Sequence, residues 1–474
     1  MSTYNTLEPS LNEILAAIKP LHDDRVTRFQ IIDELRGLVQ SLEILRGATV
    51  EPFGSFASNL YSHGADLDIS IDLYSGSFIS TAGKKHKLNL LRHLIKAMKQ
   101  RGGWHKLQFI PNARVPILKV ESNLQNISCD ISIDNLQGQM KSKFLLWIND
   151  IDARFRDMVF LVKEWAKAHN INNPKTGTFN SYSLSLLVIF HFQTCVPAIF
   201  PPLKDIYPGN IADDLTGLRA DAERHIAETC AVNILRFKSN KQRAVNRTSL
   251  SELFISFLEK FCDISLRAPN LGICTYKGQW EHIQSNTRWL PQTYALFIED
   301  PFEQPANTAR ALSAKQLLRI SEAFGLTYHR LISNLNRNTL LYTLVQQKTL
   351  QFISRAPVGN TSYTADQYQS NFPQLQRVDH LHLQNQSSNS ILCQTTRLQR
   401  PRRGYLHSQN SSSNGNCHQP YPQVQMVRNS SSEVQPQFQN TRQEGYYSNA
   451  STRKPPLQTN FNQRQQMWRP RSDR

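Results

Sequence analysis

Residues 53–73 read FGSFASNLYSHGADLDISIDL and place Asp66 and Asp68 on either side of one leucine, where an alternating segment begins. Alternation of apolar and polar residues predicts a half-buried β-strand. Side chains two apart in a strand point to the same face, so this pattern brings two carboxylates together. Such like charges repel unless a cation lies between them, and Mg²⁺ prefers carboxylate oxygens combined with phosphate oxygens. A D-x-D pair at a strand end is also common without any catalytic role.

A third carboxylate and a small turn strengthen the catalytic interpretation. Asp130 lies in the strand-like segment ISCDISID. Two metal ions held by three aspartates can activate a hydroxyl and stabilise a departing pyrophosphate in an in-line displacement. Upstream, Gly54 lets backbone N–H groups approach phosphate oxygens without a Cβ in the way, and Ser55 adds a hydroxyl donor. This combination is similar to the signature of the nucleotidyltransferase superfamily.

The later part of the chain offers candidates for a nucleotide pocket. LVKEWAKAH places Lys163 and Lys167 four residues apart on one helix face, where they can clamp the outer phosphates of a nucleoside triphosphate. A solvated basic face is the alternative. In FNSYSLSLL, we expect Ser181 to cap a helix and Tyr182 to stack on a base. A buried structural tyrosine is the alternative for Tyr182.

The segment FIEDPFEQPANTARAL is the remaining candidate for base recognition. Its carboxylate Asp300 can accept the N3–H of uracil or the exocyclic amine of adenine, so it orients a base without fully choosing it. Asn307 and Arg310 are expected to open a helix after the proline turn. The alternative is a turn followed by a helix N-cap with no role in binding.

The hydrophobic pattern divides the chain into four parts. Residues 1–45 read as amphipathic helices that we expect to join a central domain. Residues 46–150 alternate short strand patterns with one helical stretch and predict a small α/β catalytic domain. The helical period returns in 151–345, which predicts a helical central domain with a nucleotide-recognition segment near its end. Residues 346–474 are rich in Gln, Asn, Ser, Arg and Pro and predict a disordered tail.

The charge of the chain points to a polyanionic partner. The net charge is +17, and the segment from Gln351 onward holds 14 Lys and Arg residues against 5 Asp and Glu. A balance this basic is typical of proteins that bind nucleic acid or a membrane surface. Aromatic residues scattered among the arginines of the tail permit stacking on single-stranded bases, and a solvated spacer is the alternative.

Two other classes of protein are disfavoured. The seven cysteines are an odd number without C-x-x-C spacing, so neither a disulfide framework nor a zinc site is indicated. The stretch at 182–200 is long enough for a membrane span, but His191, Gln193 and the prolines that follow favour a buried helix. The first residues lack the layout of a signal peptide. We therefore expect an intracellular chain with no membrane partner.

Five motifs, taken together, resemble the noncanonical poly(A) polymerase and terminal uridylyltransferase family. GSFASNLYSHGADLD, CDISID, VKEWAKAHNI, NSYSLSLLVI and IEDPFEQPANTAR occur in this order within residues 1–345. Within the family, DNLQGQMKSKFL, TGTFNSYSLSLLVIFHFQTCVPAI, the Gln/Asn-rich tail and the closing WRPR resemble plant uridylyltransferases that tail small RNAs lacking a 2′-O-methyl group. The resemblance implies an α+β fold, in which a polymerase-beta-like nucleotidyltransferase α/β catalytic domain packs on a helical poly(A)-polymerase-type central domain, with a disordered C-terminal tail.

The resemblance also implies a function. It implies transfer of UMP from UTP to the 3′ hydroxyl of microRNAs, siRNAs and Argonaute cleavage fragments, which promotes their degradation, with Mg²⁺ or Mn²⁺ as the cofactor. Asp66, Asp68 and Asp130 become the catalytic metal ligands. The implied nucleotide-binding residues are Gly54, Ser55, Lys163, Lys167, Ser181, Tyr182, Asp300, Asn307 and Arg310. Argonaute proteins are expected partners of a monomer in the cytoplasm, including processing bodies, and in the nucleus.

This chain departs from the family pattern at two places. Many relatives have an Asn-Thr pair that holds the ribose, whereas Lys141 and Ser142 stand here. Some uridine-selective relatives have a histidine where this chain has Ala306. The motifs therefore leave two other functions open. One is an adenylyltransferase of the poly(A) polymerase type, and the other is a catalytically silent RNA-binding adaptor. Paired carboxylates with no metal to neutralise them would be a cost in stability for the adaptor.

Overall fold

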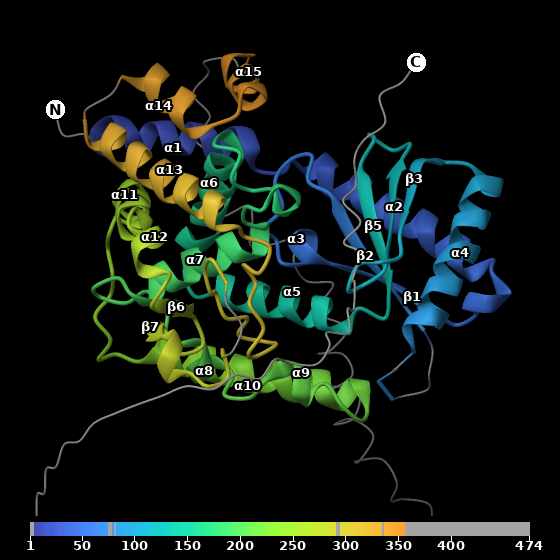
Figure 1. The fold of residues 1–474 in the computed structure, drawn as a ribbon. Coiled ribbons are helices and arrows are strands. Elements are labelled where there is room, and N and C mark those ends of the chain that lie inside the picture. Colours follow the sequence, from blue (N-terminus) through green and yellow to red (C-terminus); the bar gives the residue numbers. More distant parts are fainter. Residues whose placement is uncertain (1–3, 74–77, 80–81, 291–293, 334–335, 356–474) are drawn as a thin grey trace, which may run out of the picture. The chain divides into compact units, whose positions relative to one another are not determined.

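The computed structural model describes residues 4–73, 78–79, 82–290, 294–333 and 336–355 (Figure 1). Most of the predicted tail, including most of its arginines and aromatic residues, lies outside the described residues. The predicted start of the tail at residue 346 is wrong, because helix α15 spans Gln347–Arg355. Leu350 and Ile353 of this helix pack against the core of the helical domain. A short helix of this kind gains its stability from tertiary packing, which a search for a long apolar period misses.

A five-stranded mixed sheet forms the first folded layer. Its strands stand in the order β1-β2-β5-β4-β3. β2 and β5 run parallel, and the other neighbours run antiparallel. The strands are β1 (Thr49–Phe53), β2 (Leu67–Asp72), β3 (Trp104–Ile110), β4 (Ile117–Ser122) and β5 (Ser128–Ile133). The parallel pair β2 and β5 lies at the centre, which brings two strands far apart in sequence into register.

Helices α2 (His22–Gln40) and α4 (Lys84–Arg101) cover the sheet on the side away from α6 (Arg154–Ala168) and α7 (Ser181–Gln193) (Figure 1). The buried apolar residues of α2 and α4 share one core with those of the strands. The prediction that residues 1–45 join the central domain is therefore wrong for α2. An amphipathic pattern shows that a helix has an apolar face, but does not show which core receives that face.

A second core forms the helical domain. It takes its buried residues from α1 (Tyr4–Ile18), α5 (Leu136–Asn149), α6, α7, α11 (Leu250–Phe261) and α13 (Ala314–Ile332), among others. α5 follows the last strand directly, so it ties the sheet to this helical core. The other elements are α3 (Gly54–Ala57), α8 (Leu203–Ile206), α9 (Ile211–Asp214), α10 (Arg219–Ser239), α12 (Ile264–Arg267), α14 (Arg337–Leu344), β6 (Leu271–Cys274), β7 (Gln279–His282) and three short 3₁₀ turns, Glu43–Leu45, Pro174–Thr176 and Ile283–Ser285.

The apolar stretch at 182–200 forms most of α7, and this helix is buried on nearly all sides. Across the described ranges, no helix combines the length and the apolar character needed to cross a membrane.

Candidate active site

Three charged residues form a row across the sheet. The register pairs Asp68 of β2 with Asp130 of β5, and Asp130 with Lys119 of β4. Directly opposed residues of neighbouring strands present their side chains on the same face, so these three groups emerge together. Asp66 lies one residue before β2 begins, and not inside the strand as predicted. Its carboxylate still reaches this row, because the Lys119 Nζ donates to Asp66 Oδ2 at 3.0 Å and to Asp130 Oδ1 at 3.1 Å.

The row carries an excess of negative charge. Burial, followed by repulsion from Asp130 and Asp66, raises the pKa of Asp68 to about 7. Lys119 and, to a smaller extent, Lys163 offset this repulsion. No three His, Cys, Asp or Glu side chains are arranged to hold a metal ion within the part of the chain that the structure describes. The crowded carboxylate oxygens nevertheless suit a hard divalent cation in charge and in donor type, so the metal-ligand assignment stays a prediction.

The turn before the aspartates brings Gly54 against Asp68. Gly54 has a φ of +68°, and a Cβ at this position would lie 1.9 Å from Asp68 Oδ2. Its backbone N–H, expected to contact a phosphate, donates to Ser142 Oγ at 2.7 Å. The Ser142 hydroxyl donates in turn to the Gly138 carbonyl. Ser55 follows Gly54 in α3 and is half-buried, and its expected phosphate contact stays a prediction.

The two lysines of α6 approach the same place from the helical domain. The Lys163 side chain is buried, and its Nζ donates to the Leu60 carbonyl at 2.9 Å. Burial lowers the pKa of Lys163 to about 7, with a smaller contribution from Lys167. Burial also lowers the pKa of Lys167, which lies one turn further along α6 and is half-buried. The alternative of a solvated basic face does not describe these side chains.

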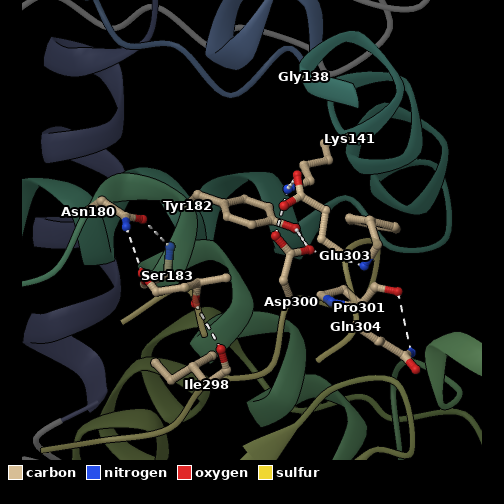
Figure 2. A network of polar contacts seen from close by, with 12 residues as sticks. Gly138, Lys141, Asn180, Tyr182, Ser183, Ile298, Asp300, Pro301, Glu303 and Gln304 are labelled. Carbon is tan, nitrogen blue, oxygen red and sulfur yellow. Dashed lines mark hydrogen bonds and ion pairs between the residues drawn. The ribbon is translucent and has the colours of Figure 1, made fainter. Parts of the chain in front are cut away.

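A cluster of polar side chains surrounds Tyr182 (Figure 2). The Tyr182 hydroxyl donates to Asp300 Oδ1 at 3.2 Å. The Lys141 Nζ lies 2.6 Å from Asp300 Oδ2 and 2.8 Å from Glu303 Oε1. It also lies 5.5 Å from the centroid of the Tyr182 ring. The structure thus brings together Tyr182 and Asp300, which the sequence predicted for base recognition, and adds Lys141 and Glu303.

The predictions that Ser181 caps a helix and that a helix opens at Asn307 are both wrong. Asn180, and not Ser181, caps α7, and its Oδ1 accepts a hydrogen bond from the Ser183 N–H at 2.7 Å. Asn and Ser are both good N-caps, so local sequence did not separate the two positions. Ser181 is exposed at the first position of the helix and lies 3.3 Å from the Asn172 side chain.

No helix begins at Asn307, because α13 begins at Ala314 with Ser313 as its cap. The buried Asn307 Oδ1 accepts from the Ile298 and Ala309 N–H groups. Its Nδ2 donates to the Leu296 carbonyl. These bonds give Asn307 a role in holding the loop, and Arg310 is exposed. A nucleotide contact for either residue stays a prediction.

Sequence reasoning missed the cations that organise the site. Lys119 sits in the alternating segment RVPILKVE, where alternation marks an outward face but not the strand opposite it. Arg28 of α2 is fully buried and donates to the Ala65 carbonyl at 2.6 Å, directly before Asp66. Arg28 therefore positions the turn that carries the first carboxylate. The available signal in the sequence was a basic residue at a position on the buried face of α2.

Comparisons with known proteins agree with this geometry. Residues 7–149 match the central palm domain of mitochondrial-like poly(A) RNA polymerases. The chain is 60% identical to Protein HESO1 of Arabidopsis thaliana over 355 residues, which cover 75% of this chain and 70% of HESO1. It is 26% identical to terminal uridylyltransferase cid1 of Schizosaccharomyces pombe over 330 residues, which cover 66% of this chain and 75% of cid1.

The fold has counterparts among solved structures. A cytoplasmic RNA terminal U-transferase superposes with a TM-score of 0.56 at 23% identity, covering 72% of this chain and 99% of that chain. At this identity the likeness concerns the fold. It confirms the predicted α+β arrangement of a nucleotidyltransferase sheet packed on a helical domain.

Proposed function

Because this chain belongs to the noncanonical poly(A) polymerase and terminal uridylyltransferase family, we propose that it transfers UMP from UTP to the 3′ hydroxyl of small RNAs that lack a 2′-O-methyl group. It is an RNA nucleotidyltransferase, as its motifs predicted. The observation that carries the assignment is the register of β2 and β5, which sets Asp68 beside Asp130. Asp66 and Asp130 both accept from the Lys119 ammonium. The high identity to HESO1 and the match to a terminal uridylyltransferase support uridine as the nucleoside.

The chain's own residues provide the parts of a phosphoryl transfer. Asp66, Asp68 and Asp130 are proposed to hold Mg²⁺ or Mn²⁺, which when bound neutralises developing charge on the transferred phosphoryl group. Lys163 and Lys167 supply cations beside these carboxylates. Tyr182 and Asp300 offer a ring face and an acceptor for the base. The close approach of Gly54 to Asp68 restricts where the Asp68 carboxylate can lie.

The test is extension of a labelled small RNA by the purified full chain with Mg²⁺. Each of the four nucleoside triphosphates is offered separately and then in competition. Preferential addition of U supports the proposal, and preferential addition of A assigns the chain as an adenylyltransferase. No addition with either Mg²⁺ or Mn²⁺ would favour the RNA-binding adaptor, although the three aspartates of the row argue for catalysis.

Lys167→Ala is expected to raise the KM for UTP about tenfold while changing kcat less. A hydrogen bond to a charged group contributes about 1.5–3 kcal/mol, and each 1.4 kcal/mol corresponds to tenfold in affinity. The measurement is steady-state extension at varied UTP. Lys175→Ala removes an exposed lysine from the turn after α6 and serves as the control. Equal KM values for both variants and the parent chain would remove Lys167 from the phosphate site.

A 2′-O-methyl group on the terminal ribose is expected to slow extension by about a hundredfold or more. The methyl removes a hydroxyl donor and adds bulk beside the attacking 3′ oxygen, and a misplacement of about 1 Å can cost roughly a hundredfold. The measurement compares matched RNAs that differ only in this methyl. Extension of both RNAs at equal rates would contradict the proposed substrate class.

The finer biological setting is also proposed. Tailing is proposed to promote decay of microRNAs, siRNAs and 5′ cleavage fragments held by Argonaute proteins. We also propose that the chain is a monomer. We propose that it is present in the cytoplasm, including processing bodies, and in the nucleus. The resemblance to plant small-RNA uridylyltransferases supports these statements. Recovery of the full chain with Argonaute, sizing of the purified chain and localisation of a tagged chain in cells are the respective tests.

A further inference from the structure

The ammonium of Lys141 occupies an unusual place in the cluster around Tyr182. Its side chain is 18% exposed and extends from α5 to the loop that carries Asp300 and Glu303. Figure 2 shows Lys141, Tyr182, Asp300 and Glu303 directed toward one another from three separate segments. The ammonium stands over the Tyr182 ring, which is the surface on which the base is expected to stack.

The hydrogen bonds within this cluster leave donor and acceptor capacity that is free to bind a ligand. A lysine ammonium has three donors, and Lys141 uses two of them on Asp300 and Glu303 among the described residues. Asp300 accepts from Lys141, from the Tyr182 hydroxyl and from the Phe302 N–H. A carboxylate has about four acceptor sites, so about one remains on Asp300. The cluster thus offers one donor beside one acceptor.

Glu303 is also largely satisfied. Its oxygens accept from Lys141 and, in two contacts, from Arg114. Burial acts to raise the pKa of Glu303, but Lys141 and Arg114 outweigh it and hold this pKa below its usual value. Glu303 therefore stays ionised and keeps the Lys141 ammonium in place. The negative charges of Asp300 and Glu303 balance the positive charges of Lys141 and Arg114. The Lys141 ammonium is therefore held in place and is not a free surface charge.

Ala306 supplies no polar side chain to this cluster. Its carbonyl accepts from the Asp300 N–H at 2.8 Å, which closes the turn beside the cluster. A methyl side chain cannot donate to a base or fill the space of a larger residue. Beside Ala306, Lys141 is a donor that reaches both Asp300 and the ring of Tyr182.

The edge of uracil matches the one donor and the one acceptor that the cluster leaves free. Uracil presents an N3–H between two carbonyl oxygens, so it brings one donor and two acceptors. Adenine and cytosine present the reverse order, with an unprotonated ring nitrogen where uracil has its N3–H and an exocyclic amine where uracil has a carbonyl. In the placement that suits uracil, the carboxylate would then face an acceptor and the ammonium would face a donor. Unpaired polar groups in a buried site are a strong basis for rejecting the wrong ligand.

We propose that Lys141 is a specificity-determining residue whose ammonium, held between Asp300 and Glu303, donates to a carbonyl oxygen of uracil and so favours UTP over ATP and CTP. This inference rests on the proposed function, because it places a nucleoside triphosphate beside Tyr182. Lys141 acts on the choice of nucleotide, and the three aspartates act on the transfer itself.

The experiment measures kcat/KM of the full chain for UTP, ATP and CTP with one labelled RNA. In Lys141→Asn, the ratio of UTP to ATP use is expected to fall about tenfold to a hundredfold, which corresponds to the loss of a charged hydrogen bond. Lys141→Arg keeps the charge and the donors and is expected to restore part of the ratio. Lys143→Asn is the matched control, because Lys143 lies on the same helix and pairs with Glu223 at 2.6 Å. Its ratio is expected to equal that of the parent chain.

The outcomes separate this inference from the proposed function. Equal losses with UTP and ATP in Lys141→Asn would make Lys141 a structural ion pair and overturn the inference alone. A parent chain that prefers ATP would overturn the proposed function and this inference with it. If Lys141→Asn does not fold, 2-thio-UTP and 4-thio-UTP are tested on the parent chain, because sulfur is the weaker acceptor. Equal use of both analogues and UTP would then contradict the inference.

Discussion

Replacing Asp68 with asparagine is expected to lower the rate of RNA tailing by at least about a thousandfold. A cation at a phosphoryl group contributes several kcal/mol of charge stabilisation, and each 1.36 kcal/mol is tenfold in rate. Asp68 pairs directly with Asp130 in the register of the sheet, so its carboxylate belongs to the row that is proposed to hold the cation. The measurement is single-turnover extension of a labelled RNA with saturating UTP and Mg²⁺.

Asp72→Asn provides the control on the same strand. Asp72 is buried and accepts hydrogen bonds from Arg219 at 2.8 Å and from Gln139 at 2.9 Å. Because its partners are structural, this variant is expected to lose about 2 kcal/mol of stability while its folded fraction remains active. Asp68→Asn is expected to show the reverse, with no fall in melting temperature, because it removes repulsion from Asp66 and Asp130. Tailing by Asp68→Asn above about a tenth of the parent rate would contradict the assignment.

Replacing Gly54 with alanine is expected to reduce tailing by about a hundredfold or more. The new Cβ would lie 1.9 Å from Asp68 Oδ2, so the carboxylate must move. A displacement of about 1 Å in a catalytic group can cost roughly a hundredfold in rate. The positive φ of Gly54 adds a backbone cost of about 1–2 kcal/mol for any L-residue. Extension rate and melting temperature are measured together.

Gly102→Ala separates the steric effect from the backbone cost. Gly102 has a φ of +77° at the end of α4, and its Cβ would meet nothing within 4 Å. Both glycines have a positive φ, so alanine is strained at either position, but a Cβ on Gly102 would displace no carboxylate. Both variants are expected to lose stability, and only Gly102→Ala is expected to retain tailing. Equal activity in the two variants would show that Asp68 tolerates the displacement and that Gly54 serves the fold alone.

The three carboxylates could be predicted from sequence because short-range patterns encode them. Alternation around Leu67 marks a strand start, and the small residues before it mark a turn with close backbone approach. Tyr182 and Asp300 came from motif order and lie in contact in the structure. The exact strand boundary was less certain, which is why Asp66 falls just outside β2.

The partners of these groups could not be predicted in the same way. Lys119 meets Asp130 because β4 pairs with β5 in one register, and an amphipathic segment does not state its register partner. Lys141 meets Asp300 across 159 residues of sequence. The sequence also left open which residue caps α7 and which core receives α2, because the alternatives look equivalent locally. The structure shows Asn180 as the cap and α2 packed on the sheet.

The sequence alone determined the type of fold and the order of the motifs, and it predicted the three candidate metal-binding carboxylates, because each of these depends on short motifs of neighbouring residues. Only the tertiary structure decided which cations face those carboxylates and that an ammonium lies beside the Tyr182 ring. The physical reason is that such ion pairs form between distant segments, and their partners are chosen by strand register and helix packing.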